Sequence, residues 1–176
     1  MKYILSLDAS TTCTGYAIFS KDKLVKSGKI VPSKVLDWRE RINHTANRLN
    51  KIIEEYDIQK IYCEDVPLKS SGGLKTLLML GAVQGMILTV ASCHDIEIEF
   101  IPVATWRRKV GLFDGTTDGK KRENLKKHSI ELANKLYKLE LNYVSKASKL
   151  NDDDISDAIL IYHSTLVKTL GRKSKV

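Results

Sequence analysis

Residues 5–16 read LSLDASTTCTGY and place an aspartate, Asp8, inside an apolar run that is typical of a β-strand. Small hydroxylated residues and a glycine, Gly15, follow it and favour a turn into a second strand. Burying an unpaired charge is costly, so the folded chain must supply a partner for this carboxylate. That partner is a metal ion, a cationic side chain or water, unless the following hydroxyls satisfy Asp8 within an ordinary turn.

Hydrophobic periodicity divides the chain into strands and helices, with no internal repeat and no linker long enough to separate domains. Alternation predicts strands at residues 2–8, 14–20, 23–31, 59–66 and 97–102. Helical spacing predicts helices at residues 37–56, 74–93, 103–110, 120–138 and 152–170, with Asp37 as the N-cap of the first. Three antiparallel strands, then strands separated by helices, indicate an α/β fold with a mixed five-stranded sheet flanked by helices. We expect one domain over residues 1–176, with a frayed tail at 171–176.

Composition is typical of a globular protein, with 43% hydrophobic and 28% charged residues among 176. The net charge of +8 favours a polyanionic partner, although many basic proteins never touch nucleic acid. Cys13, Cys63 and Cys93 lack metal-ligand spacing, so we expect reduced core thiols and a cytoplasmic location. We expect no secretory leader and no membrane contact, because the longest apolar stretch, residues 77–91, is shorter than the roughly 20 residues that span a bilayer.

A second carboxylate, Glu64, stands near the end of the strand predicted at residues 59–66, in the sequence IYCEDV. Because side chains alternate along a strand, Cys63 and Asp65 should point to one face of the sheet and Glu64 to the other. A surface position at the end of the strand is the alternative for Glu64.

The third acidic group lies in NDDDISDAILIYH, residues 151–163, at the start of the last predicted helix. Asp154 and Asp157 are three residues apart and therefore share one helical face. Asp152 and Asp153 suit helix capping, because acidic residues in the first turn complement the helix dipole. Asp157 lies too deep in the helix for that role and is flanked by apolar residues, which predicts a functional side chain.

Carboxylates gathered from three elements are typical of a site for a hard divalent cation. Without metal they would repel one another and raise each other's pKa. Two Mg²⁺ ions about 3.5–4 Å apart, for which Mn²⁺ would substitute, activate a water and stabilise a leaving oxygen. No competing set of Cys and His ligands occurs in the sequence, which disfavours zinc or copper.

Four segments together resemble the RuvC-type Holliday-junction resolvases, especially the short RuvC-like enzymes of bacteriophages such as those infecting lactococci. The segments are DASTTCTGYAIF, IYCEDVP, LLMLGAVQGMIL and DDDISDAILIYH, and the resemblance covers most of residues 3–165. It implies a ribonuclease-H-like fold, a homodimer, and magnesium-dependent nicking of four-way and other branched DNA that leaves a 5′-phosphate. It also implies that a phage-encoded protein would act in the cytoplasm of the host cell.

The resemblance matches Asp8, Glu64, Asp154 and Asp157 to the catalytic, metal-binding acids of that family. Asp153 is an alternative ligand, because three consecutive aspartates leave the register open. The bacterial enzymes carry an aromatic residue just after the strand Glu, whereas this chain has EDVPL with Pro67 near that place. The junction-opening contact and cleavage preference of the bacterial enzymes are therefore not expected to carry over.

A basic segment follows the short helix predicted at residues 103–110 and includes the helix predicted at 120–138. We expect it to contact DNA phosphates through Arg107, Arg108, Lys109, Lys120, Lys121 and Arg122. By resemblance, Lys121 or Lys120 lies near the scissile phosphate, and we assign Lys121 a catalytic role. The loop at residues 68–73 adds Lys69 as a DNA contact. A solvated charged surface is the alternative for the basic segment, and an ordinary turn for the loop.

The helix predicted at residues 74–93 is apolar almost all round, which implies burial on more than one side. Gly81 and Gly85 would allow the close approach of another backbone. Packing on the chain's own sheet is one interpretation, and a dimer interface, as in the resembling family, is the other. Two sites in a two-fold dimer suit the paired incisions that a symmetric junction requires.

Three other functions remain open. The opening motif also looks like the first phosphate loop of sugar kinases and actin-like ATPases, but 176 residues leave no room for the second domain that closes over ATP. We therefore expect no nucleotide cofactor. A non-catalytic binder of branched DNA would not need a full set of carboxylates. A ribonuclease-H-like nuclease acting on hybrids or flaps shares the motifs, and competition between substrates distinguishes it.

Overall fold

The computed structural model describes residues 1–66, 73–113, 121–145, 148 and 150–167. Its five strands are β1 (Tyr3–Ala9), β2 (Thr14–Ser20), β3 (Lys23–Ile30), β4 (Ile58–Glu64) and β5 (Glu97–Ile101). Its helices are α1 (Trp38–Glu55), α2 (Gly73–Cys93), α3 (Val103–Lys109), α4 (Arg122–Tyr137) and α5 (Asp153–Leu166). Each strand and helix predicted from periodicity is therefore present, within a few residues at its ends.

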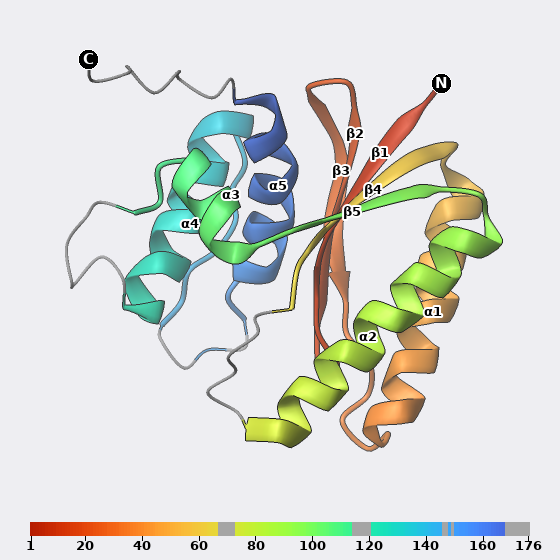
Figure 1. Ribbon diagram of the computed structural model, residues 1–176. Helices are drawn as coiled ribbons and strands as arrows, with labels where there is room; N and C mark the ends of the chain where they lie inside the picture. The colour runs from red at the N-terminus through yellow and green to blue at the C-terminus, as the bar shows by residue number, and fades with distance from the viewer. Residues whose placement is uncertain (67–72, 114–120, 146–147, 149, 168–176) are drawn as a thin grey trace, which may run out of the picture.

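The strands form one mixed sheet in the order β3-β2-β1-β4-β5 (Figure 1). β1 pairs antiparallel with β2, and β2 with β3, as the short loops between these strands require. β4 is parallel to both β1 and β5, and helices make the crossovers. The prediction of a mixed five-stranded α/β fold is confirmed.

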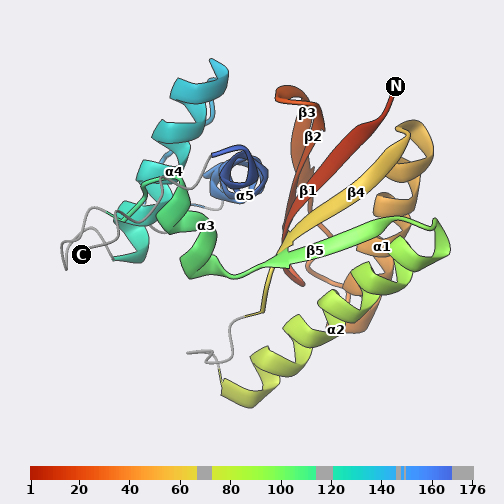
Figure 2. The same cartoon turned by 45° about the horizontal axis from the view of Figure 1, so that its top comes forward.

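Helices cover both faces of the sheet, α1 and α2 on one face and α3, α4 and α5 on the other (Figures 1 and 2). Strand alternation sends Leu5, Leu7 and Cys63 into the core beneath α1 and α2. Ala17 and Phe19 enter the second core, with Trp106 and the apolar face of α5. Because Asp8 and Glu64 follow Leu7 and Cys63 directly, alternation turns both carboxylates toward α5.

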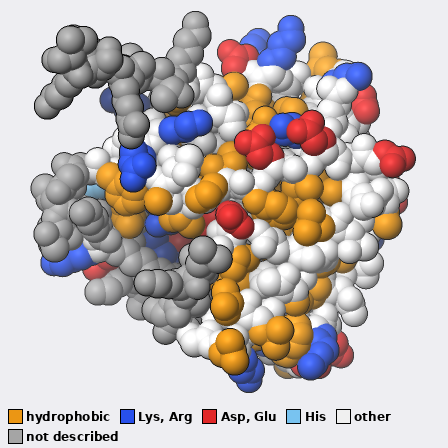
Figure 3. Space-filling model, viewed as in Figure 1, with side chains coloured by type: hydrophobic (Ala, Val, Ile, Leu, Met, Phe, Trp, Pro, Cys, Tyr) orange, Lys and Arg blue, Asp and Glu red, His pale blue; other side chains and the backbone are white. Residues whose placement is uncertain are grey.

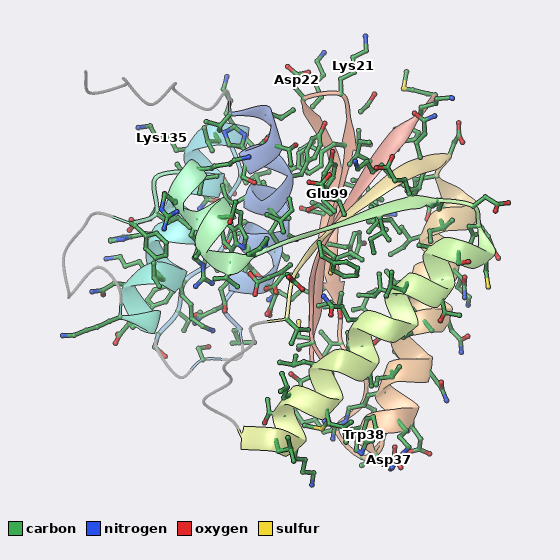
Figure 4. All side chains as sticks on the ribbon, in the orientation of Figure 1. Lys21, Asp22, Asp37, Trp38, Glu99 and Lys135 are labelled. Atoms are coloured by element: carbon green, nitrogen blue, oxygen red, sulfur yellow. The ribbon has the colours of Figure 1, made fainter. Side chains whose placement is uncertain are left out.

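The start of α1 confirms the capping prediction for Asp37 (labelled in Figure 4). Its carboxylate accepts hydrogen bonds from the backbone N–H groups of Arg39 at 2.7 Å and Glu40 at 2.9 Å. The Glu40 side chain in turn accepts from the backbone N–H of Asp37 at 2.8 Å, which completes a capping box. A cap of this kind stabilises a helix by about 1 kcal/mol, so α1 has a well-defined beginning.

One face of α2 packs on the sheet, and the opposite face is apolar and exposed (Figure 3). The residues buried against the sheet are Val83, Ile87, Val90 and Ala91. On the opposite face Leu74 is 84% exposed, Leu78 64% and Leu88 47%. The single chain therefore buries α2 on the side of its own sheet, and the second buried side, which the dimer interpretation assigns to a partner, stays a prediction. With 21 residues, α2 is also long and apolar enough to cross a membrane by length and composition, a test that core helices of soluble proteins also pass.

The cysteines are free thiols, but they do not all lie in the core. Cys63 is buried, Cys13 is half-buried in the loop after β1, and Cys93 is exposed at the end of α2. The prediction of three core thiols is therefore wrong for Cys93. Because α2 is apolar almost all round, its composition does not show which side is buried, so the exposure of a residue at its end could not be predicted.

Charged side chains border the sheet at β5, which is an edge strand of the sheet formed by the described residues (Figure 3). Lys60 on β4 forms ion pairs with Glu97 at 2.7 Å and with Glu99 at 3.0 Å. Charges along an edge strand oppose pairing with a strand of another chain. This edge of the sheet is therefore protected against aggregation.

Candidate active site

Sheet register brings Asp8 and Glu64 together at the ends of two neighbouring parallel strands. Leu7 of β1 lies opposite Cys63 of β4, so the next residues on the two strands are Asp8 and Glu64. Both side chains point toward α5, away from the core that contains Cys63. Asp65 points the other way and accepts a hydrogen bond from Gln84 of α2 at 2.8 Å. The alternation predicted for these residues is confirmed.

A close backbone contact brings the start of α5 to the same place. Gly15 of β2 is the register partner of Asp8. A Cβ atom on Gly15 would lie 1.9 Å from the carbonyl oxygen of Asp154, closer than two atoms can approach. Glycine is therefore required here, because it allows the first turn of α5 to rest on β2 beside Asp8.

Repulsion among the carboxylates shows that they share one site. Burial, followed by the charges of Glu64, Asp157 and Asp154, raises the pKa of Asp8 well above its ordinary value. Burial and the charge of Asp157 raise the pKa of Glu64 to about 7. Burial is also the main reason why the pKa of Asp154 and that of Asp157 are raised. These four residues are called the acidic cluster below.

Two consecutive residues of α3 contact two members of the acidic cluster. Trp106, which is fully buried, donates its indole N–H to Oε2 of Glu64 at 2.9 Å. Arg107 forms an ion pair with Oδ2 of Asp157, with 3.3 Å between Nη2 and the oxygen. Its positive charge also acts against the raised pKa of Asp8 and of Glu64. Trp106 is therefore a packed residue, and its hydrogen bond gives it a positioning role as well.

Asp157 is further held by α4. Ser129 of α4 donates a short hydrogen bond to Oδ1 of Asp157 and also lies 2.8 Å from the hydroxyl of Ser156. Because Ser129 is buried, with 1% of its surface exposed, its hydrogen bond holds the Asp157 carboxylate in a fixed position. No pattern in the sequence indicated Ser129, because a single serine on an amphipathic helix carries no signal of its partner.

The remaining aspartates at the start of α5 are paired with lysines. Asp152 occupies the N-cap position, but its side chain makes no capping hydrogen bond. It pairs instead with Lys29 of β3 at 2.8 Å and accepts from the backbone N–H of Asn142 at 2.9 Å. The capping role predicted for Asp152 is therefore wrong. Asp153 forms an ion pair with Lys126 of α4, which makes it a member of this outer layer of charges.

The donor set of the acidic cluster fits a hard divalent ion. Asp8, Glu64, Asp154 and Asp157 offer only oxygen atoms, and their mutual repulsion is the condition that a bound cation relieves. Among the described residues, however, no three His, Cys, Asp or Glu side chains form a group that could hold a metal ion in their present positions. The acidic cluster therefore offers the right donor atoms, but its side chains would have to draw closer around an ion. Several of the acids already have partners: Trp106 for Glu64, Arg107 and Ser129 for Asp157, and the Cys13 thiol for Asp154. Metal binding would therefore require some of these partners to be exchanged.

The predicted DNA-binding residues fall into three groups. Arg108, Lys109 and Lys121 are exposed, Lys121 at the N-cap of α4. Arg107 is directed into the acidic cluster, with 23% of its side chain exposed. Lys69 and Lys120 lie outside the described residues, as do the side chain of Arg122, residue Pro67 and the tail at 171–176.

Comparisons with known proteins connect this arrangement to one group of enzymes. Residues 1–165 match the family described as Lactococcus phage M3 protein. The crossover junction endodeoxyribonuclease RuvC of Dictyoglomus thermophilum is 23% identical, and the alignment covers 96% of this chain and 98% of that protein. The protein of the same name from Fusobacterium nucleatum is 26% identical, over 97% of this chain and 82% of its own length. The resemblance predicted from the four motifs is confirmed.

Solved structures show the same fold at low sequence identity. Thermus thermophilus RuvC in complex with a Holliday junction substrate is 11% identical with a TM-score of 0.70, over 95% of this chain and 94% of that one. The yeast mitochondrial Holliday junction resolvase Ydc2 is also 11% identical with a TM-score of 0.59, over 92% of this chain and 76% of that one. The prediction of a ribonuclease-H-like fold is confirmed by these structures.

Proposed function

The chain belongs to the Lactococcus phage M3 protein family, and from this premise we propose that it is an endodeoxyribonuclease that resolves four-way DNA junctions. Its curated relatives are named for this activity, and they align with nearly all of its length. The observation that carries the proposal is the meeting of Asp8, Glu64, Asp154 and Asp157 at one end of the sheet. A buried carboxylate cluster has no structural use that would offset the repulsion among its members.

In this proposal the acidic cluster holds two Mg²⁺ ions, for which Mn²⁺ substitutes. Divalent metal bound there supplies the activation of a water and the stabilisation of the leaving oxygen in phosphodiester hydrolysis. Asp8 and Glu64 approach the site from the sheet, and Asp154 and Asp157 approach it from α5. Asp153 belongs to the outer layer because it is paired with Lys126, which favours Asp154 over Asp153 as the ligand.

The chain's own residues fix the geometry of this reaction. Trp106 orients Glu64, and Ser129 orients Asp157, each through one hydrogen bond from a buried donor. In this proposal Lys121, at the start of α4, contacts the scissile phosphate, and the exposed Arg108 and Lys109 contact phosphates further along the strand. Cleavage leaves a 5′-phosphate and a 3′-hydroxyl, and no covalent intermediate with the protein is formed.

A homodimer suits this substrate because a four-way junction has two strands to cut. The exposed side of α2 carries Leu74, Leu78 and Leu88, with Gly81 and Gly85 between them. A Cβ atom on either glycine would meet nothing within 4 Å, so the helix surface is open to a second backbone there. We propose that the two-fold interface lies on this exposed side of α2. We also propose that the enzyme acts in the cytoplasm.

A panel of synthetic substrates tests the proposal. Purified protein is incubated with four-way, flap, RNA–DNA hybrid and linear duplex DNA, each with Mg²⁺ and with EDTA, and products are separated on denaturing gels. We expect paired nicks in the four-way junction in Mg²⁺ and no cleavage in EDTA. Preferred cutting of hybrids or flaps would support the ribonuclease-H-like alternative, and tight junction binding without cleavage would support the non-catalytic binder.

A further inference from the structure

Arg107 lies inside the acidic cluster, although it belongs to a run of basic residues that otherwise face solvent. Its neighbours Arg108 and Lys109 on α3 are exposed. The guanidinium group of Arg107 reaches Oδ2 of Asp157 at 3.3 Å, and it stacks over the ring of Trp106 with 5.0 Å between its centre and the ring centroid. The helix thus delivers one cation into a site made of carboxylates.

The fit of Arg107 in this position is incomplete. Its Nε atom is buried, and among the residues that the structure describes it finds no acceptor. The ion pair at 3.3 Å is longer than the roughly 2.7–2.9 Å of a good charge-assisted hydrogen bond. A planar guanidinium with five donors is best satisfied by a bidentate carboxylate or phosphate, and among the described residues Arg107 has neither. An unsatisfied buried donor is costly, so the present contact is not an optimised structural ion pair.

The same contact stands in the way of a divalent ion. Oδ2 of Asp157 accepts from Arg107 and Oδ1 accepts from Ser129, so both oxygens of this carboxylate are engaged. A hydroxyl can remain in place beside a metal ligand because it is neutral. A guanidinium cannot remain so easily, because two cations would then share one carboxylate in a partly buried site.

We propose that Arg107 is the internal counter-ion of the acidic cluster and competes with divalent metal for Asp157. Its positive charge balances the carboxylates when no metal is bound. When metal binds, the guanidinium group leaves Asp157, and its N–H donors then contact a DNA phosphate. Metal and DNA binding are thereby coupled through one side chain. This inference rests on the metal-binding role proposed above for the cluster.

Mn²⁺ affinity without DNA, measured by electron paramagnetic resonance or calorimetry, tests the competition. We expect Arg107→Gln to bind Mn²⁺ about tenfold more tightly than the wild-type chain, a difference of about 1.4 kcal/mol. The control is Arg48→Gln, which removes the same charge from the exposed side of α1 on the other face of the sheet. We expect the affinity of this control to stay within about twofold of the wild-type value.

A second variant keeps the test decisive if Arg107→Gln folds poorly, which thermal unfolding reveals. Arg107→Lys keeps the charge but loses the planar fork, so it should bind Mn²⁺ more tightly than the wild-type chain and less tightly than Arg107→Gln. If both Arg107 variants bind Mn²⁺ with wild-type affinity while the wild-type chain cleaves junctions, the proposed competition is overturned and the proposed function stands. A wild-type chain that neither binds Mn²⁺ nor cleaves DNA would overturn both.

Discussion

At the scale of single residues, the proposed active site consists of carboxylates that repel one another. Asp8 and Glu64 leave the sheet side by side, and Asp157 meets them from α5. Glu64 and Asp157 are each held by a donor from another element, Trp106 for Glu64 and Ser129 for Asp157. Their raised pKa values follow from this crowding, and they have a measurable consequence for stability.

We expect the metal-free protein to become less stable as the pH rises from about 5 to 7. The folded chain holds protons on the acidic cluster more tightly than the unfolded chain, because the pKa of Glu64 is raised to about 7 and that of Asp8 well above its ordinary value. Folded protein therefore binds more protons in this range, and its free energy of unfolding falls as they are lost. Glu64 alone accounts for roughly 3 kcal/mol.

Urea unfolding between pH 5 and 8, in EDTA and in Mg²⁺, checks this dependence. Bound Mg²⁺ should abolish this decrease in the free energy of unfolding, because the cation then neutralises the acidic cluster in place of the protons. Asp8→Asn should reduce the fall in EDTA, since one charge of the cluster is gone. A free energy of unfolding that stays level or rises in EDTA would contradict the crowding described for the cluster.

At the scale of secondary-structure elements, the position of α5 against β2 assembles the site. Gly15 allows the contact, and Asp154 and Asp157 are carried on the helix that makes it. The helix is also anchored by its apolar side, which includes Ile159 and Ile161 in the second core. A change at Gly15 should therefore act on both the fold and the reaction.

We expect Gly15→Ala to destabilise the protein by about 3 kcal/mol or more and to abolish cleavage. The new methyl group would lie 1.9 Å from the Asp154 carbonyl oxygen and 2.3 Å from its carbon, so α5 must move off β2. Gly28→Ala is the matched control in β3, because its methyl group would meet only the movable end of the Tyr16 ring, at 2.8 Å from the hydroxyl. Urea unfolding and junction cleavage of both variants measure the difference. Equal effects at the two glycines would contradict the role given to Gly15.

The sequence predicted the elements better than it predicted their exact contacts. Periodicity located each strand and helix, and alternation turned Glu64 and Asp65 to opposite faces, because both depend on local spacing. The ion pair of Asp152 with Lys29 and the hydrogen bond of Ser129 to Asp157 join elements that are distant in the chain. Such pairings depend on how helices dock on the sheet, which no local pattern records.

At the scale of the whole molecule, two features bear on the binding of a junction. They are the exposed apolar side of α2 and the positive net charge. The chain carries a net charge of +8, which suits a substrate rich in phosphates. Leu74, Leu78 and Leu88 form an apolar face that a single chain leaves in water. A second copy covering this face would give the two active sites that paired incisions require.

We expect Leu78→Glu to weaken the dimer by about 30-fold or more, since a buried anchor at an interface contributes about 2 kcal/mol. The stability of the single chain should change by less than about 0.5 kcal/mol, because Leu78 is 64% exposed there. Val25→Glu is the control, at another exposed apolar residue, on β3. Sedimentation equilibrium measures the association of each variant. A Leu78→Glu protein that associates like the wild-type chain would place the interface elsewhere.

The rate at which Asp8→Asn cuts a four-way junction tests the central claim most directly. The substitution keeps the size of the side chain and removes a charge that the proposed metal ions would need. In Mg²⁺, under single-turnover conditions, we predict a rate at least about 10³-fold below the wild-type rate, equal to about 4 kcal/mol of lost transition-state stabilisation. Junction binding, measured by gel shift in Ca²⁺, should be unchanged. Cleavage by Asp8→Asn at the wild-type rate would contradict the assignment of this cluster as the active site.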